Sequence, residues 1–432
     1  MLMSESLTRS KPSRLGLFAD NPRFRFLSIS LIVSTFGDQV AGVGYVFVAF
    51  GLSGSAGAVS GVVIAQVVPY LIFGLLGGAL SSIIARRQLM LFVDAMRVIL
   101  QGLLGVLALT GALSMPVLLM GVFLVSVGGS LFNPFARASM VEYVPEDRLV
   151  TANSILAIGQ NLSTVLAPVL AAVLASISIG LFFFVDAATY LLGMLFLFRL
   201  LLLDRREHQD AGGVGKAEQR IVWKTLPQEV RSALKRFYQL TRTAPVLLTL
   251  FATTFATVIF NTWSWEVGLF LRLVPGGQGE RINYSIALSI FAAVCVSVNV
   301  VILKLVKSLS MTHYLLGVVV WGVGMLGVAA LPAPVGVWLG IVVLASGLTF
   351  ASQARVFIIQ TSVPLKDVGQ AFSLAAILLY LANTLGVAIF TPLEPLTSPA
   401  VLMGVSGGGL LLCAVGGYLA VVTQGGQDDA LK

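Results

Sequence analysis

Twelve long apolar runs, separated by mostly short polar loops, are the feature that most constrains how this chain can fold. A helix that crosses the hydrocarbon core of a bilayer needs about 20 mostly apolar residues. Hydrophobic residues make up 57% of the 432-residue sequence and charged residues 11%, which is more apolar surface than a soluble protein of this length can bury. The runs occupy residues 26–50, 58–82, 89–110, 115–136, 151–177, 180–203, 245–271, 283–306, 313–331, 335–357, 369–391 and 399–423.

The runs are typical of helices, because they lack the alternation over about ten residues that marks a membrane β-strand. The sequence also argues against an enzyme. It has no Gly-x-x-x-x-Gly-Lys-Ser/Thr nucleotide loop, and its two histidines and two cysteines are too dispersed for a metal or disulfide framework. We therefore expect an all-α polytopic membrane protein with no cofactor, for which a proton gradient is the energy source.

The basic residues predict the orientation of the chain in the membrane. Lys and Arg are found in the N-terminal tail and in the second, fourth, eighth and tenth loops, whereas the first, third, fifth and ninth loops have none. Basic loops stay in the cytoplasm, so we expect both termini inside a bacterial inner membrane. This pattern explains the net charge of +8 without a nucleic-acid partner.

A hydrophilic stretch at 204–244 divides the chain into six plus six spans. We expect an N-terminal six-helix bundle over 1–203, a cytoplasmic linker over 204–244 and a C-terminal six-helix bundle over 245–432. Within the linker, 226–242 has apolar residues near one side and basic residues around them. This segment is either an amphipathic helix on the cytoplasmic leaflet or a solvated linker helix.

The two halves also repeat each other in sequence. Val144-Pro145 is followed by Ala152-Asn153-Ser154, and Val363-Pro364 is followed by Ala371-Phe372-Ser373, both at an offset of 219 residues. A repeat of six-helix units predicts two pseudo-symmetric bundles with a substrate cavity between them near the midplane of the bilayer.

Several motifs lie at characteristic places along the first half. They are Gly37-Asp38, Gly54-Ser55-Ala56, the second loop 78–87, Asp94 with Arg97, Phe132-Asn133-Pro134 through Val144-Pro145, and Phe184-Val185-Asp186-Ala187. Together they resemble the major facilitator superfamily, and within it bacterial exporters similar to the enterobactin exporter and the macrolide-efflux proteins. The second loop departs from the superfamily pattern, with Ser82 and Ile83 in place of the usual Asp and Arg, which implies a weaker or different latch.

Asp38 is our candidate for proton coupling. It lies about halfway along the first span, where an isolated charge costs a few kcal/mol. The carboxyl group must therefore be protonated part of the time, be paired, or face water, and each condition suits a carrier that takes up and releases a proton. The alternative is a buried aspartate that only joins two helices.

Other ionisable residues are expected to have gating or structural roles near the cytoplasmic end. Asp94 and Arg97 share one face of the third span and could form a pair that joins this span to the second loop. Arg137 could pair with Glu142 in the same way. The full set is Asp94, Arg97, Arg86, Arg87, Arg137 and Arg355.

Polar and aromatic residues in the spans are candidates for the substrate cavity, although most polar ones will bond helix to helix. Asp186 could line the cavity mouth or cap a helix. Trp265 and Glu266 could belong to an interfacial aromatic belt or form a stacking wall for an aromatic ligand, with Glu266 attracting a cation. The cavity candidates are Gln39, Gln160, Asn161, Asp186, Asn261, Trp265 and Glu266.

Three functions remain open from the sequence. The chain could export a small amphiphilic molecule, such as a siderophore, drug or metabolite, against a proton gradient. It could be an uptake carrier for a sugar or an organic acid. It could also be a non-transporting protein that handles lipid or acts as a sensor. In each case we expect a monomer in contact with membrane lipid.

Overall fold

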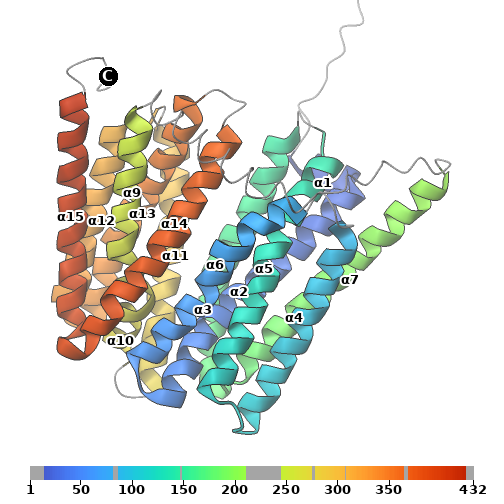
Figure 1. The fold of residues 1–432 in the computed structure, drawn as a ribbon, viewed down its shortest axis with the longest axis horizontal. Coiled ribbons are helices and arrows are strands. Elements are labelled where there is room, and N and C mark those ends of the chain that lie inside the picture. The colour runs from blue at the N-terminus through green and yellow to red at the C-terminus, as the bar shows by residue number, and fades with distance from the viewer. Residues whose placement is uncertain are drawn as a thin grey trace, which may run out of the picture.

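The structure is a computed structural model that describes residues 14–80, 86–145, 148–210, 245–274, 278–306, 308–363 and 368–424. These residues are helical almost throughout (Figure 1). Twelve of the helices in this part of the chain are long and apolar enough to cross a membrane, which confirms the predicted all-α polytopic fold. The elements of the first half are α1 (Arg14–Asp20), α2 (Pro22–Ser53), α3 (Ala56–Leu80), α4 (Arg86–Leu109), α5 (Met115–Tyr143), α6 (Leu149–Ile177) and α7 (Leu181–Asp210).

The second half contains α9 (Pro245–Trp263), η3 (Ser264–Gly268), α10 (Leu269–Leu273), α11 (Gln278–Leu305), α12 (Met311–Ala330), α13 (Val335–Ser362), α14 (Val368–Phe390), η5 (Thr391–Leu396) and α15 (Pro399–Gln424). In the first group α2 packs on α6 and α7, and α3 on α5; in the second, α12 packs on α13 and α15, and α9 on α14. The two groups stand side by side and diverge toward the end where α15 finishes (Figure 1).

The ends of α2 follow from local sequence. Asn21 caps the start, because its side-chain oxygen accepts a hydrogen bond from the Phe24 amide at 3.0 Å. The Asn21 amide group also donates to the Tyr143 carbonyl at 2.7 Å, which ties the start of α2 to the end of α5. Gly54 ends the helix with a φ of 64°, a left-handed conformation that glycine adopts readily, so α3 can begin two residues later.

The sequence repeat reappears as a repeat of helix boundaries. Helices α5 and α13 end at residues 143 and 362, and α6 and α14 begin at 149 and 368, each 219 residues after its counterpart. Val144 and Val363 have extended backbones after the two helix ends. A proline follows each of them, and a residue before proline disfavours the helical conformation.

Glycine allows close packing in the second half. A Cβ atom on Gly324 of α12 would lie 2.2 Å from the Leu344 amide nitrogen of α13, and one on Gly347 of α13 would lie 2.2 Å from the Trp321 nitrogen of α12. The two backbones are therefore in direct contact, as is typical of membrane helix pairs.

Two features differ from the predicted spans. The predicted span 245–271 contains a π-helical segment, η3, between α9 and α10, which hydropathy does not reveal. Helix α7 continues to Asp210, so it extends into the linker predicted for 204–244. The rest of that linker, including the helix predicted at 226–242, lies outside the described residues.

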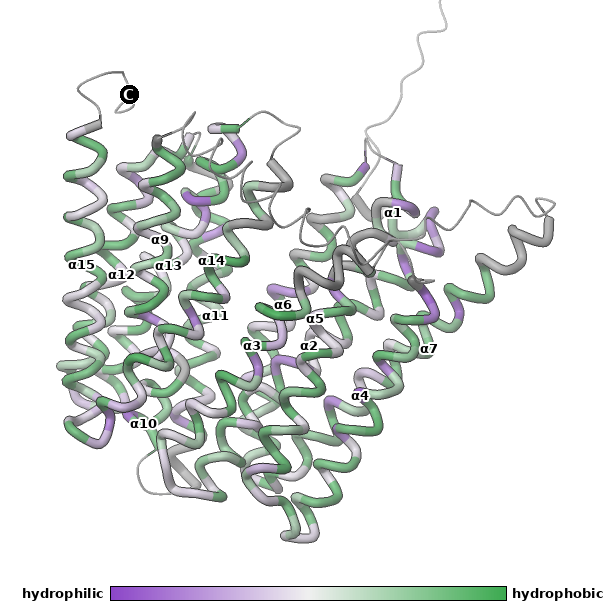
Figure 2. Tube along the Cα trace, viewed as in Figure 1, coloured by the Kyte–Doolittle hydropathy of each residue, from purple (hydrophilic) through white to green (hydrophobic). Residues whose placement is uncertain are grey.

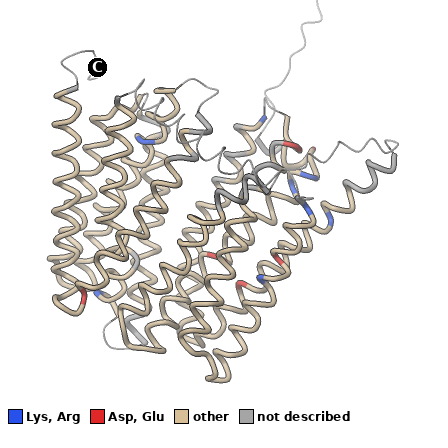
Figure 3. Tube along the Cα trace, in the orientation of Figure 1, with Lys and Arg blue, Asp and Glu red and all other residues tan. Residues whose placement is uncertain are grey.

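Apolar residues make up most of the spans, and hydrophilic residues lie both at the ends of the helices and in patches midway along them (Figure 2). Among the described residues, most Lys and Arg lie at the end of the molecule where α2 begins and α15 finishes (Figure 3). Arg272 is an exception. It lies in the last turn of α10 and donates hydrogen bonds to the Ala329 and Leu331 carbonyls at 3.1 and 3.0 Å.

Candidate functional site

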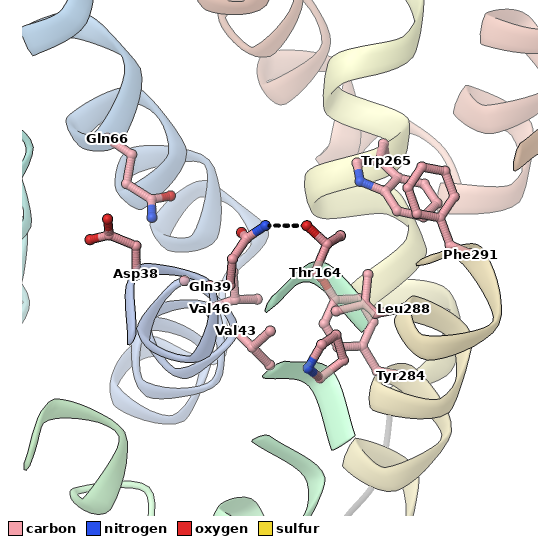
Figure 4. Close-up of a pocket in the computed structure, with 12 residues that line it drawn as sticks. Asp38, Gln39, Val43, Val46, Gln66, Thr164, Trp265, Tyr284, Leu288 and Phe291 are labelled. Atoms are coloured by element: carbon pink, nitrogen blue, oxygen red, sulfur yellow. Dashed lines mark hydrogen bonds between the residues drawn. The ribbon is translucent and has the colours of Figure 1, made fainter. Parts of the chain in front are cut away.

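A cavity of about 340 Å³ lies between the two groups of helices (Figure 4). Helices α2, α3 and α6 form one wall, and η3 and α11 form the other. The lining residues are Asp38, Gln39, Gly42, Val43, Val46, Gln66, Thr164, Pro168, Trp265, Tyr284, Leu288 and Phe291. A pocket near the middle of the spans between two helical groups is the usual place for a carrier's substrate.

Asp38 lies on the cavity wall with an exposed side chain. It is the only charged residue among the described residues that line the cavity. Gln66 of α3 lies beside it, and its amide group points toward Asp38 (Figure 4). A carboxyl group halfway along a spanning helix is thus in contact with the cavity rather than with acyl chains.

Behind Asp38, Tyr190 of α7 connects the cavity to a buried ion pair. The Tyr190 hydroxyl group donates a hydrogen bond to Asp38 Oδ1. The Arg97 guanidinium carbon lies 4.9 Å from the centre of the same ring and 5.7 Å from that of Phe132. Both distances are within the range of a cation–π interaction, so aromatic rings of α5 and α7 hold the arginine.

The Asp94–Arg97 pair lies inside the first half. Arg97 Nη1 is 3.9 Å from Asp94 Oδ1, and both side chains are buried. Arg97 Nε donates to the Val125 carbonyl at 3.2 Å, so the arginine is anchored on α5. We expected this pair to join the third span to the second loop; the described contacts run instead to α5 and α7, and residues 81–85 of that loop lie outside the described chain.

Asp186 is fully buried and does not line the cavity, contrary to our expectation that it lies at the cavity mouth or caps a helix. Gln101 donates hydrogen bonds both to Asp186 Oδ2 and to the Tyr45 hydroxyl oxygen. The reason for the burial is Gly37: a Cβ atom there would lie 2.5 Å from Asp186 Oδ1 and 1.8 Å from Thr189 Oγ1. The missing side chain lets α7 approach α2 closely.

Of the four Gln and Asn residues predicted for the cavity, one lines it and three do not. Gln39 lines the cavity and donates to the Thr164 hydroxyl oxygen at 3.1 Å. Gln160 and Asn161 are exposed and are not among the lining residues, although Gln160 lies one turn before Thr164 on α6. Asn261 does not line the cavity either, because its side-chain oxygen accepts a hydrogen bond from Trp321 Nε1 at 3.1 Å within the second half.

The second half contributes an aromatic wall. The Trp265 ring lies 4.3 Å from the Phe291 ring, centre to centre, and both line the cavity beside Tyr284. Trp265 belongs to the π-helical segment η3, and such segments often occur at functional sites. The Glu266 side chain lies outside the described part of the structure.

A buried aromatic cluster closes the cavity at the end where α2 turns into α3. The Phe47 ring of α2 lies 5.8 Å from both Phe270 and Tyr284, and Phe50 lies 5.1 Å from Phe270. At the same end the Thr391 hydroxyl group donates to Ser60 Oγ at 2.8 Å. These contacts join the two halves on one side of the cavity.

Of the remaining gating candidates, Arg87 and Arg355 are not among the residues that line the cavity. Arg87 binds Glu142 at 3.0 Å and the Tyr143 hydroxyl oxygen at 2.5 Å. Glu142 therefore pairs with Arg87, and the expected pair of Glu142 with Arg137 stays a prediction. The side chains of Arg86 and Arg137 lie outside the described part of the structure. Arg355 is half-buried in α13, with no ion pair to a described carboxylate.

The residues of the site that were not among the candidates from the sequence include Thr164, Tyr190, Tyr284 and Phe291. Helical spacing could have indicated two of them. Thr164 lies four residues after Gln160, and Tyr190 four residues after Asp186, so each shares a helix face with a residue that we had chosen. Tyr284 and Phe291 carry no such indication, because aromatic residues are common in spanning helices.

Comparison with solved structures supports the fold. The chain is similar to the peptide transporter POT in complex with sulfate (TM-score 0.68, 15% identity, covering 94% of this chain and 95% of that one). It is also similar to a POT family transporter in complex with 5-aminolevulinic acid (TM-score 0.70, 14% identity, 94% and 96%) and to the nucleoside transporter NupG (TM-score 0.62, 12% identity, 92% and 98%).

No curated protein sequence matches the chain significantly. The profile of the Major Facilitator Superfamily matches residues 27–387, which include eleven of the twelve predicted spans almost completely. The chain therefore belongs to the Major Facilitator Superfamily and is a membrane transporter rather than an enzyme.

Proposed function

We propose that this transporter couples the movement of protons to the export of a small amphiphilic molecule, such as a siderophore, a drug or a metabolite. The observation that carries the proposal is Asp38, an exposed carboxyl group midway along α2 on the wall of the cavity between the halves. A carboxylate in this position can take a proton from water on one side of the membrane and release it on the other.

The cavity wall supports an amphiphilic substrate with an aromatic or cationic part. Trp265 and Phe291 provide a flat apolar surface, and Gln39, Gln66 and Thr164 provide hydrogen-bonding groups. No described Lys or Arg lines the cavity, which argues against a strongly anionic substrate. A volume of about 340 Å³ is within the range of small-molecule pockets, about 300–1,000 Å³.

The orientation is part of the same proposal. Most described Lys and Arg lie at the end with the start of α2 and the end of α15 (Figure 3), and basic ends of spans stay in the cytoplasm. The aromatic cluster around Phe47 and Phe270 then closes the outer side. We propose a monomer in a bacterial inner membrane, surrounded by lipid, with a cytoplasmic linker between two six-helix bundles.

A reconstituted system tests the proposal. The protein is placed in liposomes with ethidium, a macrolide or a catecholate siderophore on one side, and substrate and proton fluxes are recorded together. We expect a pH gradient to drive at least one compound out of the compartment that faces the termini. Asp38→Asn should abolish proton flux coupled to substrate, whereas Asp20→Asn, a change of an exposed carboxyl group on α1, should have no effect.

The outcomes separate the alternatives. Full coupled transport by the Asp38→Asn variant would remove Asp38 from the mechanism. The similar structures include a POT transporter in complex with 5-aminolevulinic acid and a nucleoside transporter, so uptake of a polar metabolite is the second candidate. Proton-driven accumulation of a sugar, an organic acid, a peptide or a nucleoside, with no efflux of the three test compounds, would favour it. Specific binding without flux of any compound would favour a non-transporting protein.

A further inference from the structure

Arg97 is a buried cation whose contact with Asp94 is long. Within the described chain, Arg97 donates a hydrogen bond from Nε to the Val125 carbonyl at 3.2 Å. The 3.9 Å between Arg97 Nη1 and Asp94 Oδ1 is well beyond the roughly 2.7–2.9 Å of a charge-assisted hydrogen bond. Neither carboxylate oxygen of Asp94 has a hydrogen-bond partner in the described part of the structure, although both are buried. The Asp94–Arg97 ion pair therefore lacks a direct hydrogen bond between its two side chains.

Two glycines of α5 shape the space around Arg97. A Cβ atom on Gly129 of α5 would lie 2.3 Å from Arg97 Nη2, and one on Gly128 would lie 2.8 Å from Nε. These two glycines therefore create the space that the guanidinium group occupies. The rings of Phe132 and Tyr190 attract the cation, but stacking on a ring face does not fix a lateral position in the way that a bidentate hydrogen bond does.

Asp38 lies on the other side of Tyr190 and is the second partner within electrostatic reach of Arg97. Other ionisable groups near Arg97 are Tyr45 of α2, Tyr70 of α3, and Asp186 and Tyr190 of α7. Asp186 is already bound by Gln101 and Thr189. Of the three carboxyl groups in this region, Asp94 and Asp38 are therefore the two that can compete for the guanidinium group.

We propose that Arg97 is a positioning residue for proton coupling that exchanges between these two carboxylates. When a proton neutralises Asp38, Arg97 pairs with Asp94; when the proton leaves, the guanidinium group moves toward Asp38. This inference rests on the proposed role of Asp38 as the proton carrier. It adds that Asp94 acts on Asp38 through Arg97, as the alternative partner that holds the cation.

The exchange has a route to the other half of the molecule. The Tyr70 hydroxyl oxygen and Arg97 Nη2 both lie against Gly129, because a Cβ atom on Gly129 would be 2.3 Å from each of them. The Tyr70 ring stacks on Tyr380 of α14, with centres 5.5 Å apart. A displacement of Arg97 therefore changes the space available to a side chain that contacts the second half.

The test is a double-mutant cycle on the protonation of Asp38. Carbodiimides react with protonated carboxyl groups, so labelling by dicyclohexylcarbodiimide, located by peptide mapping, follows Asp38 without any transport substrate. Arg97→Gln should move the pH midpoint of Asp38 labelling upward by about one unit or more, because a nearby cation favours the carboxylate. Asp94→Asn should move the midpoint downward, because Arg97 is then available to Asp38.

The double variant, with both Arg97→Gln and Asp94→Asn, distinguishes two models. In one, Arg97 exchanges between Asp94 and Asp38; in the other, each charge acts on Asp38 independently from a fixed position. If Asp94 acts on Asp38 through Arg97, adding Asp94→Asn to the Arg97→Gln variant should cause little further shift in the pH midpoint of Asp38 labelling. Additive shifts would overturn the exchange, and unchanged midpoints in the single variants would overturn any role of Arg97 toward Asp38. In contrast, coupled transport by Asp38→Asn would contradict the proposed function and leave these labelling results as they are.

If Arg97→Gln does not fold, a variant that changes no charged residue can test the proposal instead. Gly129→Ala should displace the guanidinium group and shift the labelling midpoint, because its Cβ would collide with Arg97. Gly102→Ala on α4 is the matched control, since nothing lies within 4 Å of its Cβ position. The same midpoint in both glycine variants and in the unmodified protein would contradict the proposal.

Discussion

The Tyr190 hydroxyl group of α7 donates a hydrogen bond to the Asp38 carboxylate of α2. The same phenol ring faces the Arg97 guanidinium group, so one side chain contacts both the cavity carboxylate and the buried cation. Its two functions can be separated by mutation, because the hydroxyl group serves the first contact and the ring serves the second.

Tyr190→Phe should keep the ring and lose only the hydrogen bond. We expect a loss of about 1 kcal/mol in the free energy of unfolding and a move of the transport pH midpoint to higher pH, since a donor that favours the carboxylate is removed. Tyr190→Leu removes the ring as well and should reduce coupled transport much further. Equal pH profiles for the two variants would show that the ring contact with Arg97 has no role.

Trp265→Ala should weaken the binding of an aromatic substrate. Aromatic pairs contribute about 0.5–1.5 kcal/mol beyond burial, so the dissociation constant for ethidium should rise roughly 2- to 12-fold, and Trp265→Phe should have a smaller effect. Trp338→Phe is the control, because this tryptophan lies outside the lining residues and its Nε1 donates to the Asn283 carbonyl at 3.3 Å. An equal loss of affinity in Trp338→Phe would argue against an aromatic wall.

Gly324→Ala should destabilise the second half. The added methyl group would lie 2.2 Å from the Leu344 amide nitrogen of α13, and this backbone cannot yield as a side chain can. We expect a loss of about 1–3 kcal/mol, measured by chemical or thermal unfolding in detergent. Gly404→Ala on α15 has open space around its Cβ position and should be neutral or slightly stabilising; a loss of the same size there would refute the packing argument.

Cysteine labelling tests the orientation of the membrane protein. In a background with Cys295→Ala and Cys413→Ala, a cysteine is placed at Gln160, which is exposed on α6, or at Ser55, which is exposed between α2 and α3. A membrane-impermeant maleimide should label Gln160→Cys in inside-out vesicles and Ser55→Cys in intact cells. The reverse pattern would place the termini outside.

The twelve spans could be predicted because each one depends on a local property, a run of apolar residues of sufficient length. The repeat at Val144 and Val363 was also visible in the sequence, because proline restricts the residue before it. The π-helical segment around Trp265 was not visible in the sequence, because hydropathy does not distinguish a π-helical turn from an α-helical one.

The candidate site was predictable only in part. Asp38 was identifiable from the cost of an isolated charge in hydrocarbon, and the same argument selected Asp186, which is buried away from the cavity. The difference between them depends on Gly37, the residue before Asp38, which brings α7 close and encloses Asp186. Which carboxyl group contacts a cavity is decided by tertiary packing, and hydropathy does not contain that information.

The two walls of the cavity differ in chemistry. Its carboxyl and amide groups come from α2 and α3 of the first half, whereas η3 and α11 contribute Trp265, Tyr284, Leu288 and Phe291. Substrate preference could therefore diversify through changes on the aromatic side while the machinery for energy conversion stays intact on the other. Chimeras that graft η3 and α11 from a relative with different cargo offer a direct way to redesign selectivity.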